Sequence, residues 1–168
     1  MNVYALEYRQ DDPTKCTARK MVQMDLAIAV NRKYHAADST LVLNPYASRT
    51  VSSSDKDAKG ILDVDCSWNQ AKEVFFKRLG GKHRRLPLLL AANPTNYAKV
   101  GMLSSVEAVA ATLWLLDYVD DARRYLSIYK WGSTFESLNH EPLEEYQKAR
   151  SEPGVLELER EFFPQLFE

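Results

Sequence analysis

Four apolar stretches of the chain have the pattern of buried β-strands, at residues 3–8, 41–43, 61–64 and 86–91. The last three are nearly continuous apolar runs that end at a polar or turn residue, which is typical of strands covered on both faces. Strands of this kind favour a parallel sheet. A fifth stretch, residues 26–30, fits either another strand or the end of a helix that begins near Thr17, and its spacing does not decide between them.

A helix is predicted after the third of these runs. Ser67 and Gln70 have the spacing of a capping box, and apolar residues follow them at helical intervals. The glycine pair at residues 80–81 then supplies a stop, because glycine readily adopts the left-handed conformation that commonly ends a helix.

The rest of the chain has helical patterns only. Three more helices are predicted, over residues 104–116, 120–129 and 143–150. Ser104 and Glu107 form a capping box at the start of the first, and Pro142 fits the first turn of the third. We therefore expect an α/β fold with a parallel sheet and flanking helices at residues 1–91, followed by an all-helical C-terminal domain at residues 92–168.

The composition is that of a globular protein. With 168 residues, of which 45% are hydrophobic and 27% charged, the chain can bury one sizeable core or two small ones. Its apolar runs are too short to span a bilayer, and its start lacks the plan of a signal peptide, so we expect no membrane partner and a cytoplasmic location. Cys16 and Cys66 have no partners at zinc-site spacing, so no metal is expected.

The net charge of −1 hides an asymmetry between the two ends of the chain. Residues 1–100 hold 16 Lys and Arg against 10 Asp and Glu, whereas residues 101–168 hold 6 against 13. A basic front half fits an anionic partner such as nucleic acid. Solvated protein faces often show similar imbalances, which is the plain alternative.

The basic residues are densest between residues 77 and 85. Such a density at a helix end and loop suits phosphate contacts, because each neutralised phosphate releases counterions and adds affinity that does not depend on sequence. A solvated loop is the alternative. The residues that we assign to RNA contact are Lys77, Arg78, Lys82, Arg84 and Arg85 from this cluster, together with Lys15, Arg19 and Lys20.

The octet at residues 61–68 is the strongest candidate for chemistry. It is a buried-type strand that runs into Asp65 and then Trp68. The carboxyl ends of parallel strands open into the crevice where ligands bind, so an acid and an indole there suit a ligand with a cationic group and an apolar body. Alternatively, Asp65 and Ser67 cap the following helix and Trp68 packs on it.

Three other segments are candidates for ligand contact, and each has a plain alternative. Residues 12–17 form a turn that displays a hydroxyl, or an ordinary loop; residues 41–46 end a strand with a proline that either lines a pocket or stops the strand. Residues 91–97 are small or polar and let backbone approach a ligand, or form a generic loop. The motifs GxSxG, GxGxxG and HExxH and the P-loop are missing, so nothing local indicates their enzyme classes.

Taken together, these segments resemble the small-subunit (16S/18S) ribosomal RNA aminocarboxypropyltransferase family. DCSW and AANPxNY at this separation are specific to that family, and the sequence departs from its pattern at Ala18, Ala98 and Gly101. The matching stretches span nearly the whole chain and lie at residues 12–17 (DPTKCT), 43–45 (LNP), 64–68 (VDCSW), 85–87 (RLP), 91–97 (AANPTNY), 103–108 (LSSVEA) and 130–139 (KWG to LN).

The resemblance implies a fold and a reaction. The fold is a SPOUT-like deep trefoil knot, with the helical domain completing the cofactor site. The reaction transfers the 3-amino-3-carboxypropyl group of S-adenosylmethionine, without a metal, to a uracil-ring nitrogen of pseudouridine or N1-methylpseudouridine, and releases methylthioadenosine. The implied partner is small-subunit rRNA or the pre-ribosomal small subunit, and a monomer is expected.

The resemblance supplies a cationic ligand for the octet at residues 61–68. We hypothesise that Trp68 buries the methyl group of the cofactor and leaves the aminocarboxypropyl carbon open, while Asp65 complements the sulfonium charge, with a further hypothetical role as base. Two alternatives stay open: a SPOUT-like rRNA methyltransferase, and a non-catalytic RNA-binding protein of ribosome assembly. The residues implied to bind the cofactor are Thr17, Pro45, Val64, Leu86, Gly101 and Ser105.

Overall fold

The structure, a computed structural model, describes residues 1–9, 12–66, 71–75 and 78–168. The chain forms two compact units, and each unit is built from two stretches of sequence. The sheet unit contains Met1–Ser48 and Asp57–Arg85, and the second unit contains Arg49–Lys56 and Leu86–Glu168.

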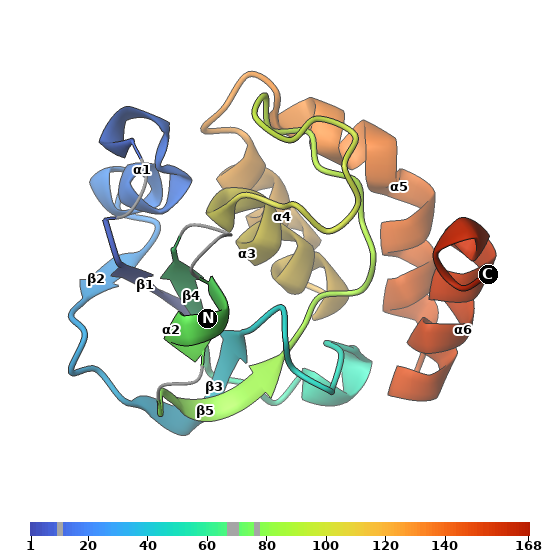
Figure 1. The fold of residues 1–168 in the computed structure, drawn as a ribbon, viewed down its shortest axis with the longest axis horizontal. Helices are drawn as coiled ribbons and strands as arrows, with labels where there is room; N and C mark the ends of the chain where they lie inside the picture. Colours follow the sequence, from blue (N-terminus) through green and yellow to red (C-terminus); the bar gives the residue numbers. More distant parts are fainter. Residues whose placement is uncertain (10–11, 67–70, 76–77) are drawn as a thin grey trace. The chain divides into compact units, whose positions relative to one another are not determined.

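The sheet unit is built on a five-stranded sheet in the order β2-β1-β4-β3-β5, and all of its pairings are parallel (Figure 1). The central strand β4 has its first five residues buried, as a continuous apolar run predicts for a strand covered on both faces. The elements of this unit are β1 (Asn2–Glu7), the 3-10 helix Pro13–Lys15, α1 (Thr17–Gln23), β2 (Ile28–Val30), β3 (Ala36–Leu43), β4 (Gly60–Asp65), α2 (Ala71–Phe75) and β5 (Gly80–Arg84).

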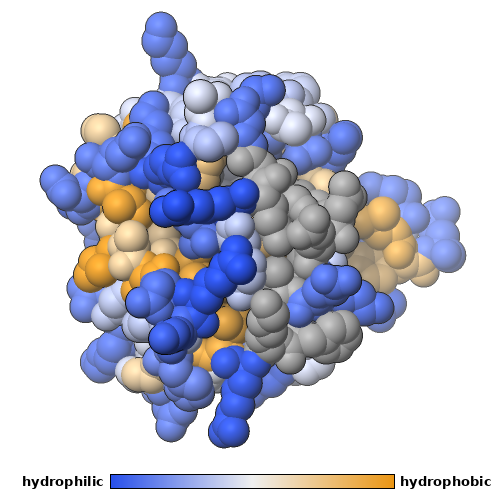
Figure 2. All heavy atoms as spheres, turned by 60° about the vertical axis from the view of Figure 1, so that its left-hand side comes forward, coloured by the Kyte–Doolittle hydropathy of each residue, from blue (hydrophilic) through white to orange (hydrophobic). Residues whose placement is uncertain are grey.

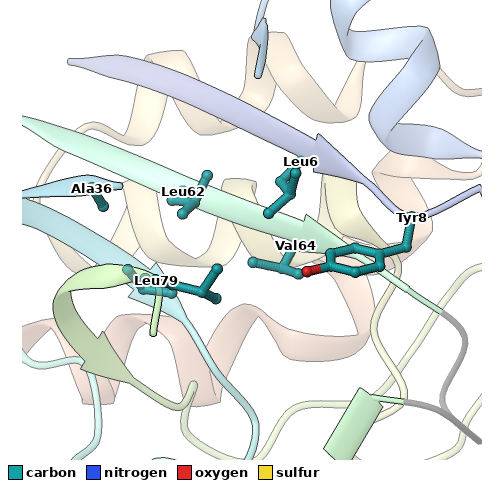
Figure 3. Packing of buried hydrophobic residues seen from close by; sticks show 7 residues of the cluster. Leu6, Tyr8, Ala36, Leu62, Val64 and Leu79 are labelled. Carbon is teal, nitrogen blue, oxygen red and sulfur yellow. The ribbon is translucent and has the colours of Figure 1, made fainter. Parts of the chain in front are cut away.

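One apolar cluster joins the strands of this sheet. Leu6 of β1 and Leu62 of β4 are fully buried, and Leu79, just before β5, closes the cluster (Figure 3). The cluster reaches the carboxyl ends of β1 and β4 through Tyr8 and Val64. The backbone at that end of the sheet is therefore anchored by packing.

The strand predictions were correct for three of the four apolar stretches. Residues 3–8, 41–43 and 61–64 fall in or at the ends of β1, β3 and β4, and the undecided stretch at residues 26–30 contains β2. The fourth prediction is wrong, because residues 86–91 belong to the second unit and the fifth strand is β5.

Gly80 and Gly81 begin strand β5, whereas the sequence pattern predicted that they end a helix. Gly80 and Gly81 have φ values of 72° and 69°, a conformation that side chains disfavour. A Cβ on Gly80 would collide with His35 and with the carbonyl oxygen of Ala36, so glycine lets β5 approach β3 closely. The predicted box of Ser67 and Gln70 lies outside the described residues.

The second unit is mainly helical. Helix α3 packs against α4 and α5, and α5 packs against α6 (Figure 1). Ser104 caps α3 in the predicted box with Glu107. The elements are α3 (Ser105–Leu115), α4 (Val119–Leu126), α5 (Gly132–Lys148) and α6 (Glu152–Phe162), with 3-10 helices at Ser53–Asp55 and Pro164–Leu166.

The predicted helix start at Pro142 is wrong, because Pro142 lies inside α5. A proline costs an interior helix one hydrogen bond, so its position favoured a new start. The helix continues because Phe135, Asn139, Leu143 and Tyr146 are buried at helical spacing on both sides of the proline. Packing of this face outweighs the local cost.

Two further parts of the predicted fold need correction. The C-terminal part is not all-helical, because residues 86–104 precede α3 without helix and include a bridge between Leu90 and Val100. The SPOUT-like trefoil knot is not supported: the described residues form an open parallel sheet of five strands. The knot was implied by the family resemblance, and the hydrophobic pattern that specifies strands carries no information on threading.

Among the described residues, no helix is both long and apolar enough to cross a membrane.

Candidate functional site

Asp65 lies at the carboxyl end of the central strand, where the sequence predicted it. It pairs in register with Glu7 of β1, and its carbonyl oxygen accepts a hydrogen bond of 2.9 Å from the N–H of Tyr8. The Asp65 side chain is half-buried. The carboxyl ends of β1 and β4 therefore present a carboxylate at the edge where parallel sheets bind ligands.

Cys16 connects this carboxylate to helix α1. The thiol donates a hydrogen bond of 3.0 Å to Oδ2 of Asp65, and the same sulfur accepts one of 3.3 Å from the N–H of Arg19 as the cap of α1. Burial, followed by the bond to Asp65, raises the pKa of Cys16 to about 12. Thr17, the first residue of α1, is thereby brought to the same edge.

Two arginines flank this edge. Arg19 forms an ion pair of 3.0 Å with Glu7, so its guanidinium is already engaged by a carboxylate. Arg32 donates a hydrogen bond of 3.1 Å to the carbonyl oxygen of Tyr8, and its guanidinium lies 4.6 Å from the centre of the Tyr8 ring. Arg32 could not be predicted from the sequence, because a single exposed arginine after a short strand carries no motif.

The loop after β3 is held by a histidine. His83 Nε2 lies 3.0 Å from the carbonyl oxygen of Gly80, which can only accept, so Nε2 donates this hydrogen bond. Its Nδ1 accepts from the Asn44 amide at 3.0 Å, and Asn44 Oδ1 accepts from the N–H of Tyr46 at 2.9 Å. These bonds fix the loop on both sides of Pro45, whose ring is exposed.

Three of the predicted cofactor residues lie in the second unit. Gly101 has φ of 74°, donates its N–H to the carbonyl oxygen of Leu89 at 2.9 Å, and has open space where a Cβ would stand. Ser105 is the first residue of α3, directly after its cap residue Ser104, and Leu86 is half-buried in the same unit. Hydrogen bonding thus orders the Gly101 backbone beside an open space.

The predicted cofactor residues fall into two sets, one in each unit. Thr17, Pro45 and Val64 belong to the sheet unit, as does the predicted catalytic residue Asp65, whereas Leu86, Gly101 and Ser105 belong to the second unit. Within the sheet unit, the Cys16–Asp65 bond joins the first turn of α1 to the end of β4. Trp68 and Lys77 lie outside the described residues.

The predicted RNA residues differ widely in exposure. Lys15 and Arg78 are exposed, and Arg19, Lys20 and Arg85 are half-buried. Lys82 lies 3.7 Å from the carboxylate of Asp57, and Arg84 is only 9% exposed, with Nη1 donating to the carbonyl oxygen of His83. Figure 2 shows hydrophilic side chains projecting over much of one face of the molecule, with apolar patches between them.

The dense basic segment is therefore not the predicted loop. Residues 80–84 form β5, whose alternating side chains point to opposite faces of the sheet. Arg84 is buried at the end of this strand, while the four residues before it are half-buried. The described residues contain no cluster of His, Cys, Asp and Glu able to hold a metal ion.

The chain is similar to several known proteins. Residues 41–163 match the family described as ribosome biogenesis protein, C-terminal. The chain is 44% identical over 164 residues to the 16S rRNA aminocarboxypropyltransferase of Sulfurisphaera tokodaii, covering 96% of this chain and 95% of that protein. It is 38% identical over 162 residues to the protein of the same name from Methanosarcina mazei, covering 95% and 94%.

A solved structure is also similar. The SAM-dependent rRNA:acp-transferase Tsr3 from Vulcanisaeta distributa superimposes with a TM-score of 0.83 at 35% sequence identity, and the match covers 95% of this chain and 96% of that one. The similarity extends over nearly the full length of both chains.

Proposed function

The chain belongs to the 16S rRNA aminocarboxypropyltransferase family, and we propose that it modifies a uracil-ring nitrogen of pseudouridine or N1-methylpseudouridine in small-subunit rRNA. Its activity is transfer of the 3-amino-3-carboxypropyl group from S-adenosylmethionine to rRNA in ribosome biogenesis. One observation carries this conclusion: the match to a SAM-dependent acp-transferase structure covers 95% of the chain.

The chemistry is a displacement at carbon. The uracil nitrogen forms a bond to the methionine γ-carbon of S-adenosylmethionine, and the bond from that carbon to sulfur breaks. The electron pair of the broken bond neutralises the sulfonium and gives methylthioadenosine, while the nitrogen loses its proton to a base or to water. Because the sulfonium has three electrophilic carbons, orientation by the protein decides which group is transferred.

Asp65 is the residue that we assign to the sulfonium. A carboxylate at the edge of the sheet offers a negative charge that complements the cationic sulfur, and the thiol of Cys16 holds one of its oxygens at 3.0 Å. The neutral thiol adds no charge of its own. The further role of Asp65 as base toward the uracil nitrogen stays a hypothesis.

The remaining assignments rest on the family resemblance and on the geometry of each unit. Thr17, Pro45 and Val64 are assigned to the cofactor from the sheet unit, where they lie on or beside the ordered ends of α1, β3 and β4. Gly101 and Ser105 are assigned from the second unit, supported by the ordered backbone and open space at Gly101. Leu86 is assigned by resemblance.

Trp68 is assigned to the wall that buries the cofactor methyl group. The assignment comes from the DCSW motif, since Trp68 lies outside the described residues. A change of Trp68 to Ala should weaken cofactor binding, because an indole contributes a large contact area. Calorimetry with S-adenosylmethionine tests this, and unchanged affinity would remove Trp68 from the pocket.

The partner is small-subunit rRNA, as free RNA or within an assembling subunit. We assign the exposed Lys15 and Arg78 to phosphate contacts, together with the half-buried Arg19, Lys20, Lys82 and Arg85. Action as a monomer and a cytoplasmic location are part of the proposal.

The identity of the sulfur product separates this function from a methyltransferase with the same cofactor. Incubation with S-adenosylmethionine and 16S rRNA that carries the pseudouridine or N1-methylpseudouridine but lacks the aminocarboxypropyl group should release methylthioadenosine, detected by liquid chromatography. Release of S-adenosylhomocysteine instead would show methyl transfer. RNA binding without either product would indicate a non-catalytic assembly protein.

A further inference from the structure

The extended segment before α3 is held along one edge by side chains from three helices. Alternate backbone N–H groups of this segment donate to side-chain oxygens, in the positions where a neighbouring strand would otherwise accept. The bonds run from Leu88 to Glu159 Oε1 at 2.9 Å, from Leu90 to Asn139 Oδ1 at 2.7 Å and from Ala92 to Glu107 Oε1 at 2.6 Å.

The opposite edge of the same segment pairs with backbone that returns antiparallel. The N–H of Gly101 donates to the carbonyl oxygen of Leu89 at 2.9 Å, and Ala91 exchanges hydrogen bonds with Lys99 and Ala98. We call residues 88–101 the bridged hairpin. Its position is set by helix side chains on one edge, and the other edge carries Gly101.

Glu107 makes the densest set of these bonds. Its side chain is fully buried, at 0% exposure, and its two oxygens accept five hydrogen bonds. Oε1 accepts from the N–H groups of Ala92 and Asn93, and Oε2 accepts from the Asn93 amide and from the N–H and hydroxyl of Ser104. A buried carboxylate requires such saturation.

These bonds exceed what capping of α3 needs. In a capping box the acidic side chain accepts one hydrogen bond, from the N–H of the cap residue, here Ser104. Ala92 and Asn93 lie at the start of the segment that leads to α3, and Ser104 lies at its end. Because Glu107 accepts hydrogen bonds from both ends, it closes residues 92–104 into a fixed loop. That loop contains Gly101 and ends beside Ser105.

We propose that Glu107 is a positioning residue for S-adenosylmethionine, whose carboxylate fixes the bridged hairpin so that the Gly101 and Ser105 backbone meets the cofactor in a preformed arrangement. The inference rests on the proposed function. Because Glu107 is buried within its own hydrogen bonds, it acts through the loop and makes no contact with the cofactor itself.

A change of Glu107 to Gln tests the proposal with little change in shape. The amide keeps one oxygen and places an NH2 group against at least two of the existing donors, so one end of the loop loses its acceptor. The control is Ser151→Ala, which removes the side-chain cap of α6 that accepts from Gly154 and touches no residue of the hairpin. Both variants lower stability, but only the first acts on the loop.

The measurement uses the full chain with 16S rRNA, below the melting temperature of each variant. Glu107→Gln should raise the Kd and KM for S-adenosylmethionine about tenfold, the scale on which loss of a supporting contact weakens a site. The value of kcat at saturating cofactor should change less, and amide exchange of Ala92 and Asn93 should quicken. Ser151→Ala should keep the Kd of the unaltered chain.

A folded Glu107→Gln variant with unaltered Kd and KM would overturn the proposal. If that variant does not fold, Ser104→Ala replaces it, because this change removes one hydrogen-bond donor to Glu107. Ser104→Ala should weaken cofactor binding, whereas Ser151→Ala should not. Equal cofactor affinities of Ser104→Ala and Ser151→Ala would also overturn the proposal. If the unaltered chain binds no S-adenosylmethionine, the proposed function fails. Independently of cofactor binding, an unaltered rate of amide exchange at Ala92 in folded Glu107→Gln would show that Glu107 does not fix the loop.

Discussion

The thiol of Cys16 donates a hydrogen bond to the carboxylate of Asp65 at 3.0 Å, although the two residues are 49 positions apart in the chain. The bond ties the first turn of α1 to the end of β4, and so places Thr17 at the edge where Asp65 ends the strand. Two segments of the family resemblance, DPTKCT and VDCSW, are therefore joined by one contact. The carboxylate of Asp65 is the charged member of this pair.

Asp65→Asn should slow aminocarboxypropyl transfer by about 100-fold to 1,000-fold, because the amide keeps the shape of the side chain but removes the charge that complements the sulfonium. Release of methylthioadenosine in a single turnover measures the effect. Asp38→Asn is the matched control, since Asp38 is an exposed carboxylate on β3 of the same unit. An Asp65→Asn variant as fast as the Asp38→Asn control would refute the role of Asp65.

Cys16 should resist alkylation, because only the thiolate reacts and burial together with Asp65 raises its pKa to about 12. Asp65→Asn removes the negative partner, which lowers the pKa of Cys16 and should speed its reaction with iodoacetamide at mildly alkaline pH. Peptide mapping by mass spectrometry follows Cys16 separately from Cys66. Equal alkylation rates in both proteins would mean that Asp65 does not act on the thiol.

The same shift in the pKa of Cys16 predicts how stability depends on pH. The thiol has a pKa of 9.0 in the unfolded chain and about 12 in the folded protein, so both states hold the proton below pH 9 and the stabilisation is fully present there. As the pH rises from about 9 to about 12, only the unfolded chain loses the proton, and the stabilisation is lost. Urea unfolding of the chain and of Cys16→Ser across this range should show a smaller decline for the variant; parallel declines would contradict the shift.

Exposed and buried basic residues should affect RNA binding differently. Replacing Lys15 and Arg78 together by Ala should reduce the slope of log affinity against log salt by about 1.4, the value for two phosphate contacts on single-stranded RNA. Arg84→Ala, at a 9% exposed position, should lower the free energy of unfolding and leave the slope unchanged. Filter binding at several salt concentrations distinguishes them, and the reverse pattern would place the RNA on the face of Arg84.

A side chain at Gly101 should interfere with the cofactor more than with folding. In Gly101→Ala the left-handed backbone conformation lowers the free energy of unfolding by about 1 kcal/mol, but the added methyl group contacts no other atom of the protein. If that space receives the adenine, the affinity for S-adenosylmethionine falls. Gly154→Ala in α6 is the control, because its Cβ makes ordinary contacts of 3.5 Å and 3.6 Å. Unaltered cofactor affinity in folded Gly101→Ala would move the pocket elsewhere.

The sequence predicted the sheet where hydrophobic runs are long and specific, as in β4. It failed at residues 86–91, which are as apolar as a central strand, because the partners of their backbone are side chains such as Asn139 and Glu159. Hydropathy reports burial and carries no information on which groups accept the hydrogen bonds. The short strand β5 was missed for the opposite reason, since its glycines and charges are typical of a loop.

The candidate site was predicted in part. Asp65 and the capping box of Ser104 and Glu107 follow from local patterns, and the structure places both as expected. The hydrogen bonds from Cys16 to Asp65 and from Ala92 to Glu107 join residues that are distant in sequence, so no local sequence pattern predicts them. The roles of the predicted cofactor residues stay predictions.

Transfer of label from S-adenosylmethionine to RNA tests the central claim most directly. The full chain is incubated with 16S rRNA that carries the pseudouridine or N1-methylpseudouridine but no aminocarboxypropyl group, and with cofactor that carries radioactive carbon in the carboxyl group or, in a parallel reaction, in the methyl group. The account predicts that carboxyl label enters the RNA and methyl label stays with methylthioadenosine. Entry of methyl label into the RNA, with carboxyl label left in solution, would contradict it.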